Sequence, residues 1–293
     1  MILIDGKKVA ADIRSELKDK ISQLKAEGKN VPGLVAIIVG EDPASQIYVA
    51  SKGKACDEIG MRTKTEKLCA DISEPELLSL IQSYNQNKDY HGILVQLPLP
   101  KHINEDKVIE TISPKKDVDG FHPISVGNLV IGKDTFASCT PAGIQELLIR
   151  YKIETKGKHV VVVGRSNIVG KPIANIMLQK AEGANSIVTI VHSAAKDISY
   201  YTKQADILIA AIGKAEMIKA DMVKDGVAVI DVGINRIDDP TKAKGYRIVG
   251  DVDFENVSKK ASFITPVPGG VGPMTIAMLL SNTYKAYNLY GEK

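Results

Sequence analysis

The chain has 293 residues, of which 44% are hydrophobic and 25% are charged, and its formal net charge is +3. This composition indicates a globular protein of one large domain or two ordinary ones, and it argues against a nucleic-acid partner because no long basic block accompanies the small charge. No apolar run approaches the roughly 18 residues of a membrane-spanning helix, so no membrane partner is expected.

The cysteines and histidines exclude further classes of protein. Cys56, Cys69 and Cys139 lie far apart and form no C-x-x-C pair, which predicts reduced thiols and a cytoplasmic location. The opening stretch "MILIDGKKVA" lacks the apolar core and the cleavage site of a signal peptide. The histidines show no metal-ligand spacing and no H-E-x-x-H pattern, so no metal is predicted.

The first half of the chain alternates buried strands with amphipathic helices. Residues 34–39 ("LVAIIV") predict a strand, and residues 42–60 predict a helix that Asp42 caps and Gly60 ends. A second helix over 74–87 and a strand over 92–97 follow, with a short strand between the two helices. This alternation of strands and helices predicts a parallel α/β unit.

A second α/β series follows a passage rich in loops. After a helix over 140–153, the stretch "HVVVVG" (159–164) predicts a strand, and "GKPIANIMLQKAEG" predicts a helix. Three further apolar strands are expected in "SIVTIV", "ADILIAAIG" and "VAVIDVG", and a Gly/Pro turn then leads into a long helix within 266–290. The pattern predicts two α/β lobes with a boundary near 120–145, and the last helix packs on either lobe.

The stretch "VVVVGRSNIVGKP" resembles a phosphate-binding turn. A strand, a glycine turn and a helix start present backbone N–H groups to a phosphate. Gly164 and Gly170 are present, but Ser166 stands where the second glycine of G-x-G-x-x-G belongs. An ordinary tight turn between strand and helix therefore remains an alternative. A Walker A loop is excluded because Pro172 follows Lys171.

The end of the next strand bears on the choice of cofactor. NAD-binding folds usually place an acidic residue there to hold the ribose hydroxyls. Here His192 and Ser193 take that place, so a 2′-phosphate meets no repulsion, and Arg165 could pair with it as a fork-shaped donor. The sequence therefore favours NADP over NAD. The alternative for Arg165 is a solvated arginine in a loop.

The first lobe carries four stretches that could form a reaction site. Tyr48 and Lys52 in "IYVASK" share one helix face, either as a proton-transfer pair or as two ordinary surface residues. Gln96 ends a buried strand, where ligands collect in open α/β sheets. Asp119 in "KKDVDGFHP" either forms a turn or faces a ligand with N–H donors. The glycines of "PGGVGPMT" (268–275) form an ordinary loop or allow close approach of a flat ligand.

Taken together, these stretches resemble one family, the bifunctional methylenetetrahydrofolate dehydrogenase/methenyltetrahydrofolate cyclohydrolases. The resemblance covers nearly the whole chain and rests on the order and spacing of "YVASK", "VQLPLP", "KDVDGFHP", "VVVGRSNIVGKP", "DVGIN" and "PVPGGVGPMT". It implies oxidation of methylenetetrahydrofolate by hydride transfer to NADP+, followed by hydrolysis to formyltetrahydrofolate. It also implies a homodimer and an α/β substrate lobe joined to a Rossmann-like, doubly wound nucleotide lobe, with the active-site cleft between them.

The resemblance also implies a role for each matching residue. Lys52 serves the cyclohydrolase step by managing the proton of the attacking water, Gln96 holds and tunes Lys52, Tyr48 lies against the folate rings, and Asp119 grips the pterin end. The other implied folate contacts are Val95, Leu97, Pro268, Gly269, Gly270, Val271, Gly272, Pro273 and Thr275. The implied cofactor contacts are Gly164, Arg165, Ser166, Ser193, Gly233 and Ile234. The division that follows is 1–138 plus 270–293 for folate and 139–269 for NADP.

The chain departs from the family's pattern at one position, and three other classes of protein remain as alternatives. Family members often carry a basic residue directly after the His-Ser pair, where this chain has Ala194, so the preference for NADP over NAD is expected to be weaker than usual. Tyr-x-x-x-Lys is also typical of short-chain dehydrogenases, but there it follows the glycine turn. A shikimate-type or amino-acid dehydrogenase would share the two lobes without explaining "VQLPLP" and "PGGVGPMT". A non-enzymatic folate or nucleotide sensor requires an inert Lys52.

Overall fold

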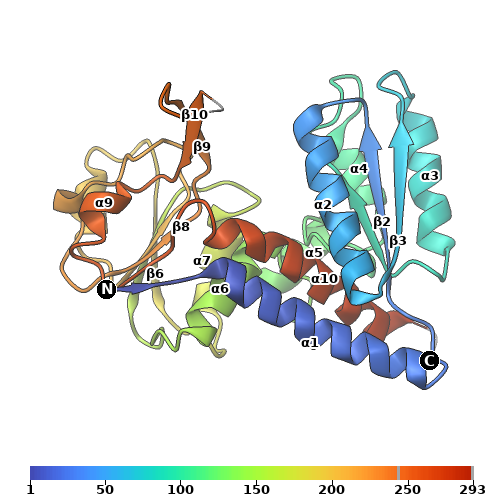
Figure 1. The fold of residues 1–293 in the computed structure, drawn as a ribbon, viewed down its shortest axis with the longest axis horizontal. Helices are drawn as coiled ribbons and strands as arrows, with labels where there is room; N and C mark the ends of the chain where they lie inside the picture. Colours follow the sequence, from blue (N-terminus) through green and yellow to red (C-terminus); the bar gives the residue numbers. More distant parts are fainter. Residues whose placement is uncertain (243–244, 292–293) are drawn as a thin grey trace. The chain divides into compact units, whose positions relative to one another are not determined.

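The computed structural model describes residues 1–242 and 245–291, and contacts within the chain divide it into two compact units (Figure 1). We name each unit after its main sheet. The three-stranded unit comprises Ala11–Cys139 and Ile276–Lys293, and the six-stranded unit comprises Met1–Ala10 and Thr140–Thr275. In the described part of the chain, no helix is both long and apolar enough to cross a membrane.

The three-stranded unit is built on a parallel sheet with the order β3-β2-β4. Helices α2 and α3 flank this sheet in Figure 1. The core between the sheet and its helices contains Val35, Ile37, Leu77, Ile81 and Ile93. The strands are β2 (Gly33–Val39), β3 (Arg62–Leu68) and β4 (Gly92–Val95), and the helices are α1 (Gly6–Ala26, from Ala11 on), α2 (Pro43–Ile59), α3 (Glu74–Gln86), α4 (Glu105–Thr111), α5 (Pro123–Val130) and α10 (Val271–Tyr290, from Ile276 on).

The six-stranded unit has an all-parallel sheet with the order β1-β11-β8-β7-β5-β6. The chain leaves β5 toward β6 on one side and continues through β7 and β8 on the other, so the sheet is doubly wound, as predicted. A two-stranded ribbon, β9 with β10, projects from this unit in Figure 1. The elements are β1 (Ile2–Leu3), α6 (Cys139–Arg150), β5 (His159–Val163), α7 (Gly170–Leu178), β6 (Ile187–Val191), α8 (Ile198–Thr202), β7 (Ile207–Ala210), η1 (Ala220–Met222), β8 (Ala228–Asp231), β9 (Asn235–Asp238), β10 (Tyr246–Val249), α9 (Phe254–Val257) and β11 (Phe263–Ile264).

Local sequence signals account for the ends of helix α2. The Asp42 carboxylate accepts a hydrogen bond from the Ser45 N–H at 2.7 Å, and Pro43 occupies the first turn. Gly60 ends the helix in the left-handed conformation, with a φ of 77° that most other residues avoid. The predicted helix over 42–60 is confirmed, and so are the strand at 34–39 and the helix at 74–87. The strand predicted over 92–97 ends two residues earlier, at Val95.

The structure contains elements that were not predicted, including α4 and α5 in the passage that was expected to be rich in loops. Helix α1 buries Val9, Ile13, Leu17 and Ile21, a four-residue spacing that is visible in the sequence. The ribbon of β9 and β10 has half-buried, charged strands that carry little periodic signal. Strand β1 is two residues long and is defined by its pairing with β11, which no local pattern reveals.

The contacts of the N-terminal segment define compact units whose bounds differ from those of the predicted folate and NADP parts. The Ile4 N–H donates to the Ile264 carbonyl at 2.8 Å, and the Lys7 N–H donates to the Gly269 carbonyl at 3.0 Å. These bonds join residues 1–10 to the six-stranded unit, whereas the division drawn from the sequence grouped them with the folate lobe. Residues 270–275 also belong to the six-stranded unit, because the boundary between the units falls within α10, after Thr275. The predicted division grouped them with the folate lobe.

Candidate active site

A lysine and a glutamine meet in the three-stranded unit. Helix α2 presents Lys52, and Gln96 directly follows the last residue of β4. The Lys52 ammonium donates to Gln96 Oε1 at 3.1 Å, and Gln96 Nε2 donates to the Leu97 carbonyl at 2.7 Å. The second bond fixes the orientation of the amide, so that its oxygen faces the ammonium. The amide is therefore a neutral partner that holds the Lys52 side chain in place.

Asp119 lies close enough to Lys52 for the two charges to interact. Burial raises the pKa of the Asp119 carboxyl above its ordinary value, and the positive charge of Lys52 acts in the opposite direction. The Cys139 thiol lies 3.9 Å from Asp119 Oδ1. The structure therefore brings together three of the predicted site residues, one cation, one amide and one carboxyl group, from separate parts of the sequence.

Buried polar groups hold the loop that carries Asp119. The Asp117 carboxylate accepts from the Phe121 N–H at 3.1 Å and from the His122 N–H at 2.9 Å. On α10, the Asn282 amide donates to the Val118 carbonyl at 2.8 Å and to the Ala137 carbonyl at 3.0 Å. These bonds fix the backbone on both sides of Asp119, which limits where its carboxyl group can point.

Tyr48 lies one helical turn before Lys52 and is 51% exposed. Its ring is available to a flat ligand on the helix face that also carries Lys52. Val95 and Leu97 flank Gln96 at the end of β4, and Val95 is buried whereas Leu97 is partly exposed. Val95, Gln96 and Leu97 thus lie at the carboxyl end of the sheet, the edge where ligands bind in parallel α/β folds.

In the six-stranded unit, a glycine turn follows β5. Gly164 has a φ of 133°, and a Cβ there would lie 2.2 Å from the Ala211 carbonyl oxygen. A Cβ at Gly170 would lie 2.3 Å from the Gly164 carbonyl oxygen. Both positions therefore require glycine because of close backbone contacts. The turn sits at the switch point of the doubly wound sheet, where dinucleotides bind in this class of fold.

The two polar residues of this turn differ in their contacts. Arg165 is exposed. Ser166 Oγ accepts from the Val169 N–H at 3.1 Å and from the Gly170 N–H at 3.3 Å, so it stabilises the start of α7. Ser166 was predicted as a cofactor contact, and the structure adds these two hydrogen bonds to the start of α7, which a sequence pattern does not reveal.

The remaining predicted cofactor residues share the same edge of the sheet. Ser193 follows β6 and is exposed, whereas Gly233 and Ile234 follow β8, with Ile234 58% exposed. Since β5, β6 and β8 run parallel, their carboxyl ends meet at one edge. A pocket of about 170 Å³ lies at this edge, lined by Lys7, Ile248, residues 231–234 and the loop 266–273. In the described residues, no group of three or more His, Cys, Asp or Glu side chains is arranged to hold a metal ion.

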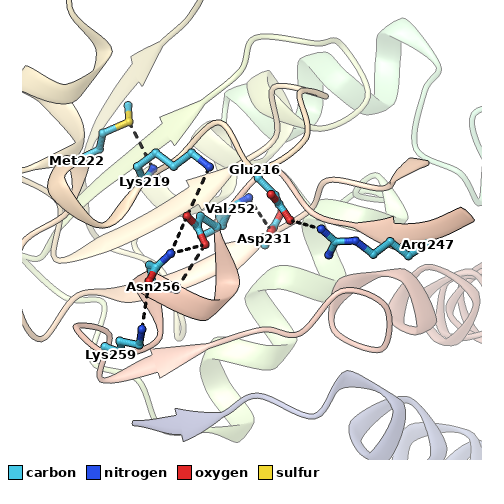
Figure 2. A network of polar contacts seen from close by, with 9 residues as sticks. Glu216, Lys219, Met222, Asp231, Arg247, Val252, Asn256 and Lys259 are labelled. Atoms are coloured by element: carbon cyan, nitrogen blue, oxygen red, sulfur yellow. Dashed lines mark hydrogen bonds and ion pairs between the residues drawn. The ribbon is translucent and has the colours of Figure 1, made fainter. Parts of the chain in front are cut away.

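Two buried aspartates of this unit were not identified from the sequence as site residues. Asp231 ends β8 within the stretch "DVGIN", and burial raises the pKa of its carboxyl to about 6. Its Oδ2 accepts a hydrogen bond from the Val252 N–H at 3.0 Å (Figure 2). The second aspartate, Asp251, is fully buried. An aspartate at the end of a buried strand is the available signal for Asp231, and the stretch "VGDVD" gives no comparable signal for Asp251.

The fold and site together define an α/β dehydrogenase with a nucleotide-binding unit and a separate substrate unit. Residues 138–290 match the family model described as "Tetrahydrofolate dehydrogenase/cyclohydrolase, NAD(P)-binding domain", and residues 4–119 match that of the catalytic domain of the same family. The chain belongs to the tetrahydrofolate dehydrogenase/cyclohydrolase family. It is accordingly a bifunctional enzyme of one-carbon folate metabolism with dehydrogenase and cyclohydrolase activities.

Relatives support this assignment over the full length of the chain. The "Bifunctional protein FolD" of Chloroherpeton thalassium is 62% identical over 98% of both chains. The crystal structure of a bifunctional enzyme FolD from Campylobacter jejuni has a TM-score of 0.92 at 52% identity, covering 98% of this chain and 99% of that one. A Trypanosoma brucei dehydrogenase-cyclohydrolase "complexed with NADP cofactor and inhibitor" has a TM-score of 0.91 at 39% identity, covering 98% of this chain and 97% of that one.

Proposed function

We propose that this enzyme oxidises methylenetetrahydrofolate with NADP+ and that Lys52 then serves the hydrolysis of the methenyl product. The observation that carries the proposal is the 3.1 Å hydrogen bond between Lys52 Nζ and Gln96 Oε1. This hydrogen bond joins two groups with different roles. The lysine can exchange a proton during the reaction, and the neutral amide keeps the lysine in place. The three-stranded unit supplies these groups and the six-stranded unit supplies the cofactor site.

The dehydrogenase step requires positioning more than acid–base chemistry. Bound NADP+ accepts the hydride, and the protein has to hold the folate carbon against it and exclude water. We assign this positioning to the ring of Tyr48, to Val95 and Leu97, to Asp119 at the pterin end, and to the glycine-rich loop 268–275. The Asp119 carboxyl group suits a pterin because it can accept the ring's N–H donors.

The choice of NADP rests on the absence of an acidic side chain after β6 and on the exposed guanidinium of Arg165. His192, Ser193 and Ala194 follow that strand, so no carboxylate there repels a 2′-phosphate. The Trypanosoma brucei relative, which was solved with NADP, supports the same choice. Gly164, Ser166, Gly233 and Ile234 complete the proposed contacts with the cofactor.

A spectroscopic assay tests the proposed function as a whole. Purified enzyme is supplied with methylenetetrahydrofolate and either NADP+ or NAD+, and the formation and later decay of the methenyl absorbance are followed. We expect reduction of NADP+ with a higher kcat/KM than that of NAD+, and a methenyl intermediate that decays faster than in buffer. Equal kcat/KM values for the two cofactors would refute the NADP preference, and inactivity with both would refute the proposed dehydrogenase step.

We also propose that the enzyme is a cytoplasmic homodimer whose copies pair through their six-stranded units. Strand β6 is an edge strand of that sheet, so it pairs with β5 along one edge and its other edge has no neighbouring strand in the sheet. Ile187 and Ile190 on this edge are 64% and 43% exposed. An apolar edge strand offers unpaired backbone groups and apolar surface to a second copy. The cytoplasmic location is supported by the three cysteines, which are all free thiols.

Replacing Ile190 by lysine is expected to shift the enzyme from dimer to monomer at micromolar concentration, because the dimer would have to bury an unpaired charge. Sedimentation velocity measures the change. Leu289→Lys is the matched control, since Leu289 is an apolar residue of the other unit with a similar exposed fraction, 50% against 43% for Ile190. An Ile190→Lys variant that sediments as the wild-type dimer would exclude this strand from the interface.

A further inference from the structure

We propose that Asp251 is a positioning residue of the cofactor site, which fixes the chain segments after β7 and β8 through hydrogen bonds from both. The inference depends on the proposed roles of Gly233 and Ile234 in cofactor binding and extends them to a residue that contacts neither substrate nor cofactor. It follows from the contacts of a single buried carboxylate.

Both oxygens of the Asp251 carboxylate are occupied. Oδ2 accepts from the Ile212 N–H at 2.7 Å and from the Gly213 N–H at 2.8 Å, just beyond the end of β7. Oδ1 accepts from Nδ2 of Asn235 at 2.9 Å, at the start of β9. The side chain is fully buried, and within residues 1–242 and 245–291 no lysine, arginine or histidine forms an ion pair with it. Backbone and amide donors therefore stabilise its charge.

The segment that carries Ile234 is held between two carboxylates. The Gly233 N–H donates to Asp231 Oδ1 at 2.9 Å, and the next-but-one residue, Asn235, donates to Asp251. A Cβ at Gly233 would lie 2.3 Å from Asp251 Oδ1, so glycine is required for the carboxylate to fit. The exposed Ile234 lies between these two anchored positions, and its placement at the sheet edge therefore depends on Asp251.

The two aspartates are also linked to each other. The Asp251 N–H donates to Asp231 Oδ1 at 2.9 Å. Burial raises the pKa of the Asp231 carboxyl, and the negative charge of Asp251 contributes in the same direction. Together they connect the ends of β7 and β8 with the segment 250–252 that follows β10. The chain segments after β7 and β8 thus both depend on hydrogen bonds to the Asp251 side chain.

An asparagine at position 251 tests the inference because it keeps the shape of the side chain but replaces one acceptor oxygen by an NH2 donor. Its NH2 group cannot accept from the Ile212 and Gly213 N–H groups, so these groups either lose their acceptor or keep a neutral one, in which case the amide of Asn235 must reverse to accept from the NH2 group. We expect Asp251→Asn to raise the KM for NADP+ at least tenfold and to lower the dehydrogenase kcat. Cyclohydrolase activity, measured with methenyltetrahydrofolate and no nucleotide, should stay within twofold of wild type.

Two further variants keep the test decisive. Asn235→Ala removes one of the three hydrogen bonds and should raise the KM for NADP+ about threefold to tenfold, even if Asp251→Asn does not fold. Asp253→Asn makes the same chemical change two residues away, where the carboxylate caps α9 and pairs with Lys219 at 3.4 Å. It should leave the KM for NADP+ unchanged.

The outcomes separate this inference from the proposed function on which it depends. Equal losses of both activities in Asp251→Asn and Asn235→Ala would show a general structural role and overturn the inference. Unchanged KM values in both variants, with a raised KM in Arg165→Ala, would overturn it while leaving the proposed cofactor site intact. Unchanged KM values in all three would overturn the inference together with the proposed cofactor site.

Discussion

Replacing Lys52 by methionine is expected to reduce the cyclohydrolase rate by at least about 100-fold, the lower end of what general acid–base catalysis contributes. Methionine retains most of the side chain's length and apolar stem but cannot exchange a proton. It also leaves Gln96 Oε1 without its donor and removes the cation that opposes the raised pKa of Asp119. Hydride transfer requires no acid or base from the protein, so the dehydrogenase step should lose less than hydrolysis does.

The decay of methenyl absorbance measures this effect, and NADP+ binding measures whether the variant is folded. Lys54→Met is the matched control, because Lys54 is on the same helix, its side chain is 80% exposed, and it pairs with Glu58 at 4.0 Å. The control should hydrolyse methenyltetrahydrofolate at the wild-type rate. Hydrolysis at the wild-type rate by Lys52→Met would remove the lysine from the mechanism.

Replacing Arg165 by alanine is expected to raise the KM for NADP+ about 10-fold to 100-fold, because a charge-assisted hydrogen bond contributes about 1.5–3 kcal/mol. The KM for NAD+ should change less than about twofold, since NAD+ has no 2′-phosphate to lose a partner. The ratio of the two constants is the informative quantity, because damage to the fold would alter both. Since Arg165 is exposed, the effect should shrink as salt concentration rises.

Lys180→Ala is the control for this second prediction. Lys180 is an exposed cation that follows the far end of α7, the helix that begins at the glycine turn. Its removal changes the net charge by the same amount but should leave both Michaelis constants unchanged. A proportional rise for NADP+ and NAD+ in Arg165→Ala would show that the arginine does not read the 2′-phosphate.

Much of the fold could be predicted because its signals are local. The buried strand β2, the capped helix α2 and the glycine turn after β5 all carry their own signals in a few consecutive residues. Strand β1 could not be predicted in this way, because two residues become a strand only through pairing with β11, about 260 residues later.

The site divides along the same line. Side chains such as Lys52, Asp119 and Arg165 could be identified as candidates from their residue type and motif. The contact between Lys52 and Gln96 joins positions that are 44 residues apart, and only the α/β topology brings them together. Asp251 escaped identification because two of its three partners are backbone N–H groups, which every residue except proline carries and which no sequence pattern distinguishes.

The edge strands of the two sheets have a consequence for assembly. Strand β3 is one of the two edges of the three-stranded sheet, and four of its seven residues are charged: Arg62, Lys64, Glu66 and Lys67. Charged edges resist pairing with another chain. Pairing of β6 with β6 closes into a symmetric pair, whereas pairing through two different edges would join copies head to tail without limit. In the proposed dimer, the charges of β3 therefore disfavour the addition of further copies at this edge.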